Sequence, residues 1–325
     1  MRLSLALVVG LVVVIAIAVT FGETALSAWQ YRQAFSDPAS APAEILWSIR
    51  APRAIAAALV GAALGLAGAT MQGLLRNPLA DPGVLGVSGL AGLGAAVAIA
   101  GGLASLPGAV EAAALAGALV AGALVVTLAA RLREPEALVL FGVALSAMGG
   151  ALTALVFNLS PSPVTTAEVL SWLLGSVANR DWGDIGAALI PAGLGAALCA
   201  YAARGLRMLT LGEETAALSG LPMARLRAAA VAGAALLTGA AVAMAGVIGF
   251  VGLAAPHLVR GAVSDDPART LVPSALAGAI LLVAADLAAR MIATDEELKL
   301  GVVTALFGAP LFALVAWRAA RSWRA

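Results

Sequence analysis

Long apolar runs separated by short polar breaks are the dominant pattern along this chain. The runs are filled with Ala, Leu, Val and Gly and reach about 20 residues, the length that a helix needs to cross a bilayer. Spanning strands would instead alternate apolar and polar positions over about ten residues. The pattern therefore predicts an all-α membrane protein. About ten spans are expected, at Leu3–Gly22, Ala54–Leu75, Leu85–Gly101, Ala112–Ala130, Ala137–Leu159, Ile185–Ala203, Ala228–Ala245, Val247–Val263, Leu271–Ile292 and Leu300–Trp317.

Two of these runs leave alternatives open. Val247–Val263 is short and contains Pro256, so this helix could be broken or only partly inserted. Leu3–Gly22 follows Arg2 and precedes small residues, as a cleaved signal peptide would, but it is already long enough to span.

Composition agrees with the apolar pattern and narrows the partners. The chain is 62% hydrophobic and 11% charged, which leaves too little polar surface to cover a soluble globule. A net charge of +1 argues against a nucleic-acid partner. The single cysteine, Cys199, excludes an internal disulfide. Neither a linker nor a fixed-period repeat divides residues 1–325, so one transmembrane domain is expected.

The distribution of Lys and Arg predicts the orientation. With the N-terminus in the cytoplasm and about ten spans, most of the 19 Lys and Arg residues fall in cytoplasmic segments. Both termini are therefore expected in the cytoplasm.

The stretch LTLGEETAALSGLPMARLR, residues 209–227, is polar between two apolar runs and would face the cytoplasm. Glu213 and Glu214 suit the first turn of a helix, Gly220 can end it, and Pro222 suits the first turn of another. Two short helices joined by a turn are expected. Helices this short need support, either from the protein's own cytoplasmic face or from a soluble partner.

Four stretches carry a resemblance to a known family. Residues 50–89, 172–176 (WLLGS), 246–260 (GVIGFVGLAAPHLVR) and 285–312 resemble the FecCD family of ABC importer permeases, in the same order. The resemblance implies a ten-span subunit of the bacterial inner membrane, used as a homodimer. It also implies two copies of an ATPase subunit and an extracytoplasmic binding protein that delivers the cargo.

The resemblance assigns about residues 209–222 of this polar stretch, the coupling segment, to contact with the ATPase. The residues concerned are Leu211, Gly212, Glu213, Glu214, Ala217, Leu218, Gly220 and Leu221. The chemistry agrees, because a phosphate-binding loop needs a GK[ST] sequence and the only lysine, Lys299, precedes Leu300. No catalytic residue and no cofactor are expected in this chain, and ATP and Mg would belong to the ATPase.

Three arginines are expected around the outer mouth. By the resemblance, Arg50, Arg53 and Arg290 dock carboxylates of the binding protein. Alternatively, Arg50 and Arg53 anchor their span at the headgroups, while Arg290 pairs with Asp286 four residues before it. Asp286 lies inside an apolar run, where an ionisable group needs a partner or serves transport.

Two proline-containing breaks are expected near the pathway. Asn77–Pro78 interrupts the chain between two spans, as a plain cytoplasmic turn or as a re-entrant connection. Pro256–His257 interrupts a later run. One histidine without a nearby cysteine supports no metal site, so His257 is expected to make a helix-end hydrogen bond.

The sequence departs from the resembling family at two places. Where the cobalamin member carries small hydroxyl residues at its inner gate, this chain has Glu134, Pro135 and Glu136. These acids could repel anionic cargo, bind arginine across a dimer, or lie in a solvated turn. The family's ELP sequence is ELK here, at residues 297–299.

These observations predict a permease of an ATP-driven importer, surrounded by membrane lipid. The expected cargo is an iron chelate, either a siderophore complex or haem, with cobalamin as the alternative. A transporter driven by an ion gradient would need acidic groups facing a midplane cavity, and apart from Asp286 the expected spans hold essentially none. A membrane anchor without transport would not explain the ordered breaks.

Overall fold

The computed structural model describes residues 2–22, 24–129, 135–160, 162–292 and 297–322, which form helices without any strand. The expected all-α fold is confirmed. The elements are α1 (Arg2–Thr20), α2 (Ala28–Ser36), α3 (Ala41–Glu44), η1 (Ile45–Arg50), α4 (Ala51–Leu75), η2 (Pro82–Leu85), α5 (Val87–Ala100), η3 (Leu103–Ser105), α6 (Ala109–Ala129), α7 (Pro135–Leu159), α8 (Pro163–Leu173), α9 (Trp182–Leu209), α10 (Glu213–Leu218), α11 (Met223–Ala245), α12 (Val251–Arg260), η4 (Gly261–Val263), α13 (Pro267–Met291) and α14 (Leu300–Ser322).

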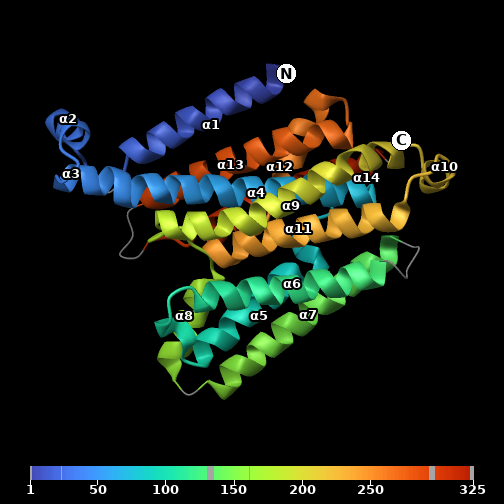
Figure 1. The fold of residues 1–325 in the computed structure, drawn as a ribbon, viewed down its shortest axis with the longest axis horizontal. Coiled ribbons are helices and arrows are strands. Elements are labelled where there is room, and N and C mark those ends of the chain that lie inside the picture. The colour runs from blue at the N-terminus through green and yellow to red at the C-terminus, as the bar shows by residue number, and fades with distance from the viewer. Residues whose placement is uncertain (1, 23, 130–134, 161, 293–296, 323–325) are drawn as a thin grey trace.

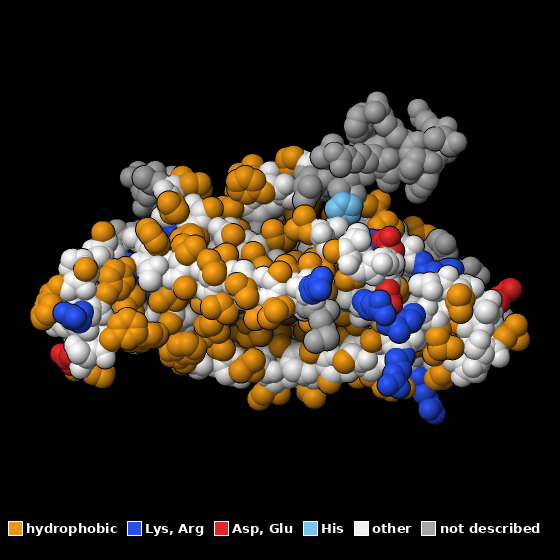
Figure 2. Space-filling view, turned by 90° about the horizontal axis from the view of Figure 1, so that it is seen from above, with side chains coloured by type: hydrophobic (Ala, Val, Ile, Leu, Met, Phe, Trp, Pro, Cys, Tyr) orange, Lys and Arg blue, Asp and Glu red, His pale blue; other side chains and the backbone are white. Residues whose placement is uncertain are grey.

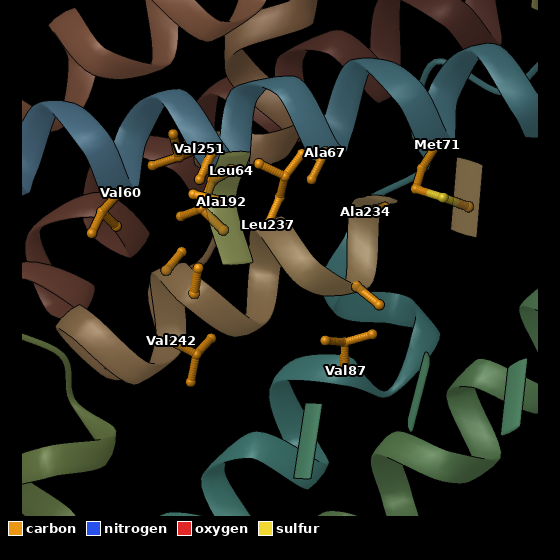
Figure 3. Packing of buried hydrophobic residues seen from close by; sticks show 14 of the residues in the cluster. Val60, Leu64, Ala67, Met71, Val87, Ala192, Ala234, Leu237, Val242 and Val251 are labelled. Atoms are coloured by element: carbon orange, nitrogen blue, oxygen red, sulfur yellow. The ribbon is translucent and has the colours of Figure 1, made fainter. Parts of the chain in front are cut away.

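The long helices form one bundle with α4 and α11 at its centre (Figure 1). α4 packs against α13, α11 and α12, while α11 also packs against α9 and α6. α5 extends the bundle by packing between α6 and α7. Apolar side chains fill the centre, and Figure 3 shows Leu64 and Ala67 of α4 close to Leu237 of α11.

Glycines on α4 let neighbouring helices approach closely. A Cβ atom at Gly61 would overlap the carbonyl of Gly278 in α13, and one at Gly65 would overlap that of Ser274. A Cβ atom at Gly68 would overlap the carbonyl oxygen of Gly252 in α12. Backbone contact of this kind is how small residues hold membrane helices together.

Helices occur at all ten expected runs, but they differ in length. In the described part of the chain, 7 helices are long and apolar enough to cross a membrane. Two further apolar stretches are shorter than that, namely α5 with 14 residues and Leu300–Pro310 at the start of α14. The number of membrane crossings, and the side of the membrane on which each terminus lies, stay predictions.

The expected span Val247–Val263 is wrong as one continuous helix. α12 has only 10 residues, which is about 15 Å of helix, half of the roughly 30 Å hydrocarbon core. The shortening has a backbone cause, because Gly246 has a φ of 70° and Phe250 a φ of 67°, and neither fits a right-handed helix.

One end of the bundle gathers the start of α1, the end of α14 and the short helix α10 (Figure 1). Figure 2 shows most of the Lys and Arg side chains of the visible face toward this same end. Arg207 and Arg269 are among its exposed cations, with side chains 56% and 70% exposed. This end is the one that the sequence assigns to the cytoplasm.

Candidate functional site

Three motif segments that are distant in sequence meet at one junction. The end of α8, the link between α11 and α12, and the start of α14 are joined by backbone hydrogen bonds. Ser176 N–H donates to the Ala245 carbonyl at 2.8 Å, and Leu300 N–H donates to the Gly175 carbonyl at 2.9 Å. Gly301 N–H donates to the Leu174 carbonyl at 3.0 Å. Irregular backbone among membrane helices is tolerated where such bonds satisfy it.

Glycine is required at this junction for two reasons. Gly175 and Gly246 have φ angles of 75° and 70°, which side chains of L-residues rarely adopt. A Cβ atom at Gly246 would also overlap the Trp172 carbonyl, and one at Gly301 would overlap the Leu174 carbonyl. These motifs were recognisable in the sequence, but no role for their glycines was expected.

Cavities of contrasting character lie on either side of the junction. A polar cavity of about 590 Å³ is lined by Trp172, Ser176, Gly246 and Lys299 together with residues at the starts of α6 and α9. An apolar cavity of about 620 Å³ is lined by Leu174, Val247, Gly301 and other residues of α8 and α14. The junction thus lies between a cavity with a polar lining and one with an apolar lining.

Charged side chains line the polar cavity. Arg180 Nη1 lies 2.9 Å from Glu111 Oε1 and 3.7 Å from Asp184 Oδ2. The Arg180 Nε atom is buried without a hydrogen-bond partner among the described residues. Lys299, the departure from the family's ELP sequence, also lines this cavity.

Helix α4 ends at Leu75, just before Asn77–Pro78, and the chain that follows folds back into the bundle. Asp81 caps η2 by accepting from Gly83 N–H at 2.7 Å. The Ser146 hydroxyl, well inside α7, donates to the Gly83 carbonyl at 3.4 Å. A Cβ atom at Gly252 in α12 would lie 3.0 Å from Pro82. These contacts favour the re-entrant connection over a plain surface turn.

The break expected at Pro256–His257 is wrong, because both residues lie inside α12. Pro256 has no N–H, so the carbonyl of Gly252 has no partner one turn later in the helix. That carbonyl instead faces Gly68 of α4, where a side chain would overlap it. The true break precedes α12. His257 is exposed in its last turn, and its expected helix-end hydrogen bond stays a prediction.

Arg53 is held inside the bundle by two carboxylates. Its Nη2 atom lies 2.8 Å from Asp286 Oδ1, and its Nη1 atom donates to Glu297 Oε2 at 3.1 Å. The side chains of Arg53 and Asp286 are 13% and 2% exposed. The network therefore ties α4 to α13 and to the segment before α14.

Arg50 and Arg290 are buried as well. Arg50 donates to the carbonyls of Thr20, the last residue of α1, and of Thr24, and Arg290 donates to that of Ala18. The expected pair between Arg290 and Asp286 is confirmed, with Nε 3.2 Å from Oδ2. None of the three arginines presents a free guanidinium, so their docking role stays a prediction that requires these contacts to open.

The coupling segment contains the short helix α10. Gly212, with a φ of 99°, turns the chain into α10, and Glu213 and Glu214 occupy its first turn. Arg227 Nη2 lies 2.8 Å from Glu213 Oε2 and fixes α10 to the start of α11. Gly220, with a φ of 83°, turns the chain out. The expected second short helix is wrong, because α11 runs unbroken from Met223.

The coupling segment exposes leucines beside polar side chains, which include Glu214 and Thr215 of α10. Leu218 is 90% exposed and Leu211 is 69% exposed, whereas Ala216 is 1% exposed and packs against the bundle. Ala217 is also exposed, and Leu221 is half-buried. Exposed leucines on and beside a helix too short to be stable alone are suited to a protein partner.

The proposed inner gate cannot be placed in full. Glu134 lies outside the described residues, and of Pro135 and Glu136 only the helical backbone at the start of α7 is described. The gate therefore stays a prediction. Within the described ranges, no group of three or more His, Cys, Asp or Glu side chains could hold a metal ion.

The bundle of long apolar helices, with a break between α11 and α12 and the short exposed helix α10 at one end, has the features of a membrane transport protein. The FecCD transport family matches residues 10–318. The chain belongs to this family, and it is the permease of an ABC importer of the inner membrane.

Relatives and a solved structure agree with this assignment. The vitamin B12 import system permease proteins BtuC of Salmonella typhimurium and Shigella flexneri are each 42% identical over 284 residues, covering 85% of this chain and 84% of the relative. A metal-chelate type ABC transporter, solved in an inward-facing conformation, aligns with a TM-score of 0.87 and 30% identity, over 98% of this chain and 99% of that chain.

Proposed function

We propose that this chain carries a metal chelate through the inner membrane, with cobalamin as the first cargo and an iron chelate as the second. The 42% identity to vitamin B12 permeases over 284 residues supports cobalamin. The resemblance to a metal-chelate type transporter supports the wider class. The sequence alone favoured an iron chelate, and the names of the relatives reverse that order.

ATP hydrolysis belongs to a separate subunit in this proposal. In a homodimer of the permease, the exposed leucines on and beside α10 of each copy would contact one of two ATPase subunits. Cargo would arrive on an extracytoplasmic binding protein. The absence of a phosphate-binding lysine motif supports this division, since Lys299 is the only lysine.

Reconstitution into liposomes tests the proposal. The permease with its cognate ATPase and binding protein should take up radiolabelled cobalamin in the presence of ATP, and the permease alone should hydrolyse no ATP. Uptake of a ferric siderophore or haem but not cobalamin would select the second cargo. Uptake driven by a proton or sodium gradient without any ATPase would contradict the whole scheme.

A further inference from the structure

A small pocket at the cytoplasmic end lies where four helices begin or end. It has a volume of about 260 Å³. Gln72 lies three residues before the end of α4, Thr210 follows α9, Arg260 ends α12 and Pro267 begins α13. The transport mechanism proposed above makes no use of this pocket.

Gln72 contributes a buried amide whose orientation is fixed by its neighbour. Gln72 is 3% exposed, and its Oε1 atom accepts a hydrogen bond from Arg260 Nη2. Since a guanidinium only donates, the amide oxygen must face Arg260 and the amide nitrogen must face elsewhere. That nitrogen, Nε2, has no partner among the described residues. A buried donor of this kind needs an acceptor.

Donors exceed acceptors around the pocket. Arg76, which follows α4 with a φ of 49°, is exposed and has no ion-pair partner in the described part of the chain. Arg260 adds a second cation, partly balanced by Asp265, which is the only acid among the described lining residues. The hydroxyl protons of Thr210 and Thr270 are already donated to backbone carbonyls. The nearby acid Asp266 is engaged by Arg207 and Arg269.

The geometry points to a binding site for a phosphate group in this pocket, held by Arg76, Arg260 and the Gln72 amide. Donors from three side chains suit an anion with at least three oxygens, and arginine binds phosphate with paired N–H groups. The helix ends put the pocket at the boundary between the apolar spans and the cytoplasm. That boundary is also the level of phospholipid headgroups, so the phosphate can belong to an anionic lipid or be free in solution.

Binding is tested on the purified, delipidated full-length chain in detergent. Thermal unfolding is measured against inorganic phosphate, and separately against phosphatidylglycerol in mixed micelles, with chloride at matched ionic strength. Stabilisation by both identifies the phosphate group itself as sufficient. Stabilisation by phosphatidylglycerol alone identifies a lipid site. Absence of stabilisation by either overturns the proposal.

Two variants localise the effect. Gln72→Glu keeps an acceptor for Arg260 but replaces the free donor with a carboxylate, and Arg76→Gln removes an exposed cation at little structural risk. Each should raise the dissociation constant about tenfold or more, because each removes one hydrogen bond to a charged group. Arg225→Gln, an exposed cation at the same end outside the pocket, should bind as the natural chain does. Equal binding by all three variants would contradict the assignment.

Discussion

Arg53 of α4 and Asp286 of α13 form a buried ion pair, with Nη2 2.8 Å from Oδ1, although 233 residues separate them in the chain. Glu297 and Arg290 complete the network. A buried charge without its partner is costly, so these residues must first be considered as structural. A binding protein that docks onto Arg53 or Arg290 has to compete with the ion pairs that these arginines already make.

The first prediction concerns this pair. Arg53→Gln should lower the free energy of unfolding by about 3–5 kcal/mol, because it leaves the Asp286 carboxylate buried beside fewer cations. Thermal unfolding of the purified chain measures the loss. Arg32→Gln, an exposed arginine in α2, is the matched control and should unfold like the natural chain. The double variant Arg53→Gln with Asp286→Asn should recover part of the stability; if it unfolds earlier than either single variant, the pairing is not what stabilises this region.

The ion pair of Arg53 with Asp286 decides which variant can test docking of the binding protein. Arg53→Glu would place three carboxylates together, so a loss of binding-protein affinity could reflect local unfolding. We expect Arg53→Lys, which keeps a cation beside Asp286, to retain the fold and to lower the affinity for the binding protein, because an ammonium cannot pair with a partner's carboxylate through two parallel N–H groups. Affinity is measured at low and high salt by surface plasmon resonance. Unchanged affinity at low salt would argue against docking by Arg53.

The second prediction concerns α10. Leu218→Asp and Ala217→Arg lie on its exposed surface, so the permease should stay folded while the ATPase no longer copurifies, since an unpaired charge would be buried at the contact. Ala216→Asp is the contrasting variant, because Ala216 is 1% exposed inside the chain and its replacement should lower the unfolding temperature. Normal copurification of the ATPase with both surface variants would exclude this surface as the contact.

The third prediction concerns the contact between α4 and α12. Gly68→Ala places a methyl group on the Gly252 carbonyl, which must move, and should destabilise the chain by about 1–3 kcal/mol or more. Gly193→Ala is the control, because nothing lies within 4 Å of the added carbon and alanine favours the helix. Thermal unfolding compares the two. Equal stability of the two variants would mean that the close approach is not required.

The fourth prediction concerns pH and Asp266, which caps α13. Burial of its carboxyl, the largest single influence, raises its pKa, but hydrogen bonds from Arg269 N–H, the Arg207 side chain and Ala268 N–H together hold the pKa below its usual value. The stabilisation is therefore complete above the pKa of an unfolded aspartate, about 3.9, and is lost as the pH falls through the lower folded value.

Asp266→Asn keeps the helix cap and removes the charge. The variant should be less stable than the natural chain at neutral pH by about 1 kcal/mol or less, since its partners are exposed. The difference should shrink below roughly pH 4. Thermal unfolding at both pH values measures it, with Asp37→Asn in the exposed segment after α2 as the control. If the stability difference between Asp266→Asn and the natural chain is the same at both pH values, the charge of Asp266 does not stabilise the fold.

The sequence determined the helices and the exposed coupling segment, because both depend on residues close together in the chain. An apolar run of about 20 residues is a helix in a membrane wherever it packs. The turns at Gly212 and Gly220 follow from glycine's own backbone freedom. The pair of Asp286 with Arg290 was also predictable, since residues four apart share a helix face.

Only the tertiary structure decided which helices are neighbours. Nothing within one turn of Asp286 indicates that Arg53 of α4 reaches it, or that residues 172–176, 245–247 and 300–301 share backbone hydrogen bonds. The shortened helix α12 has the same origin, because its start is fixed by contacts of Gly246 with the end of α8. Apolar runs specify that helices form, but most of their surfaces are equally apolar, so side-chain and glycine contacts between distant segments select the packing.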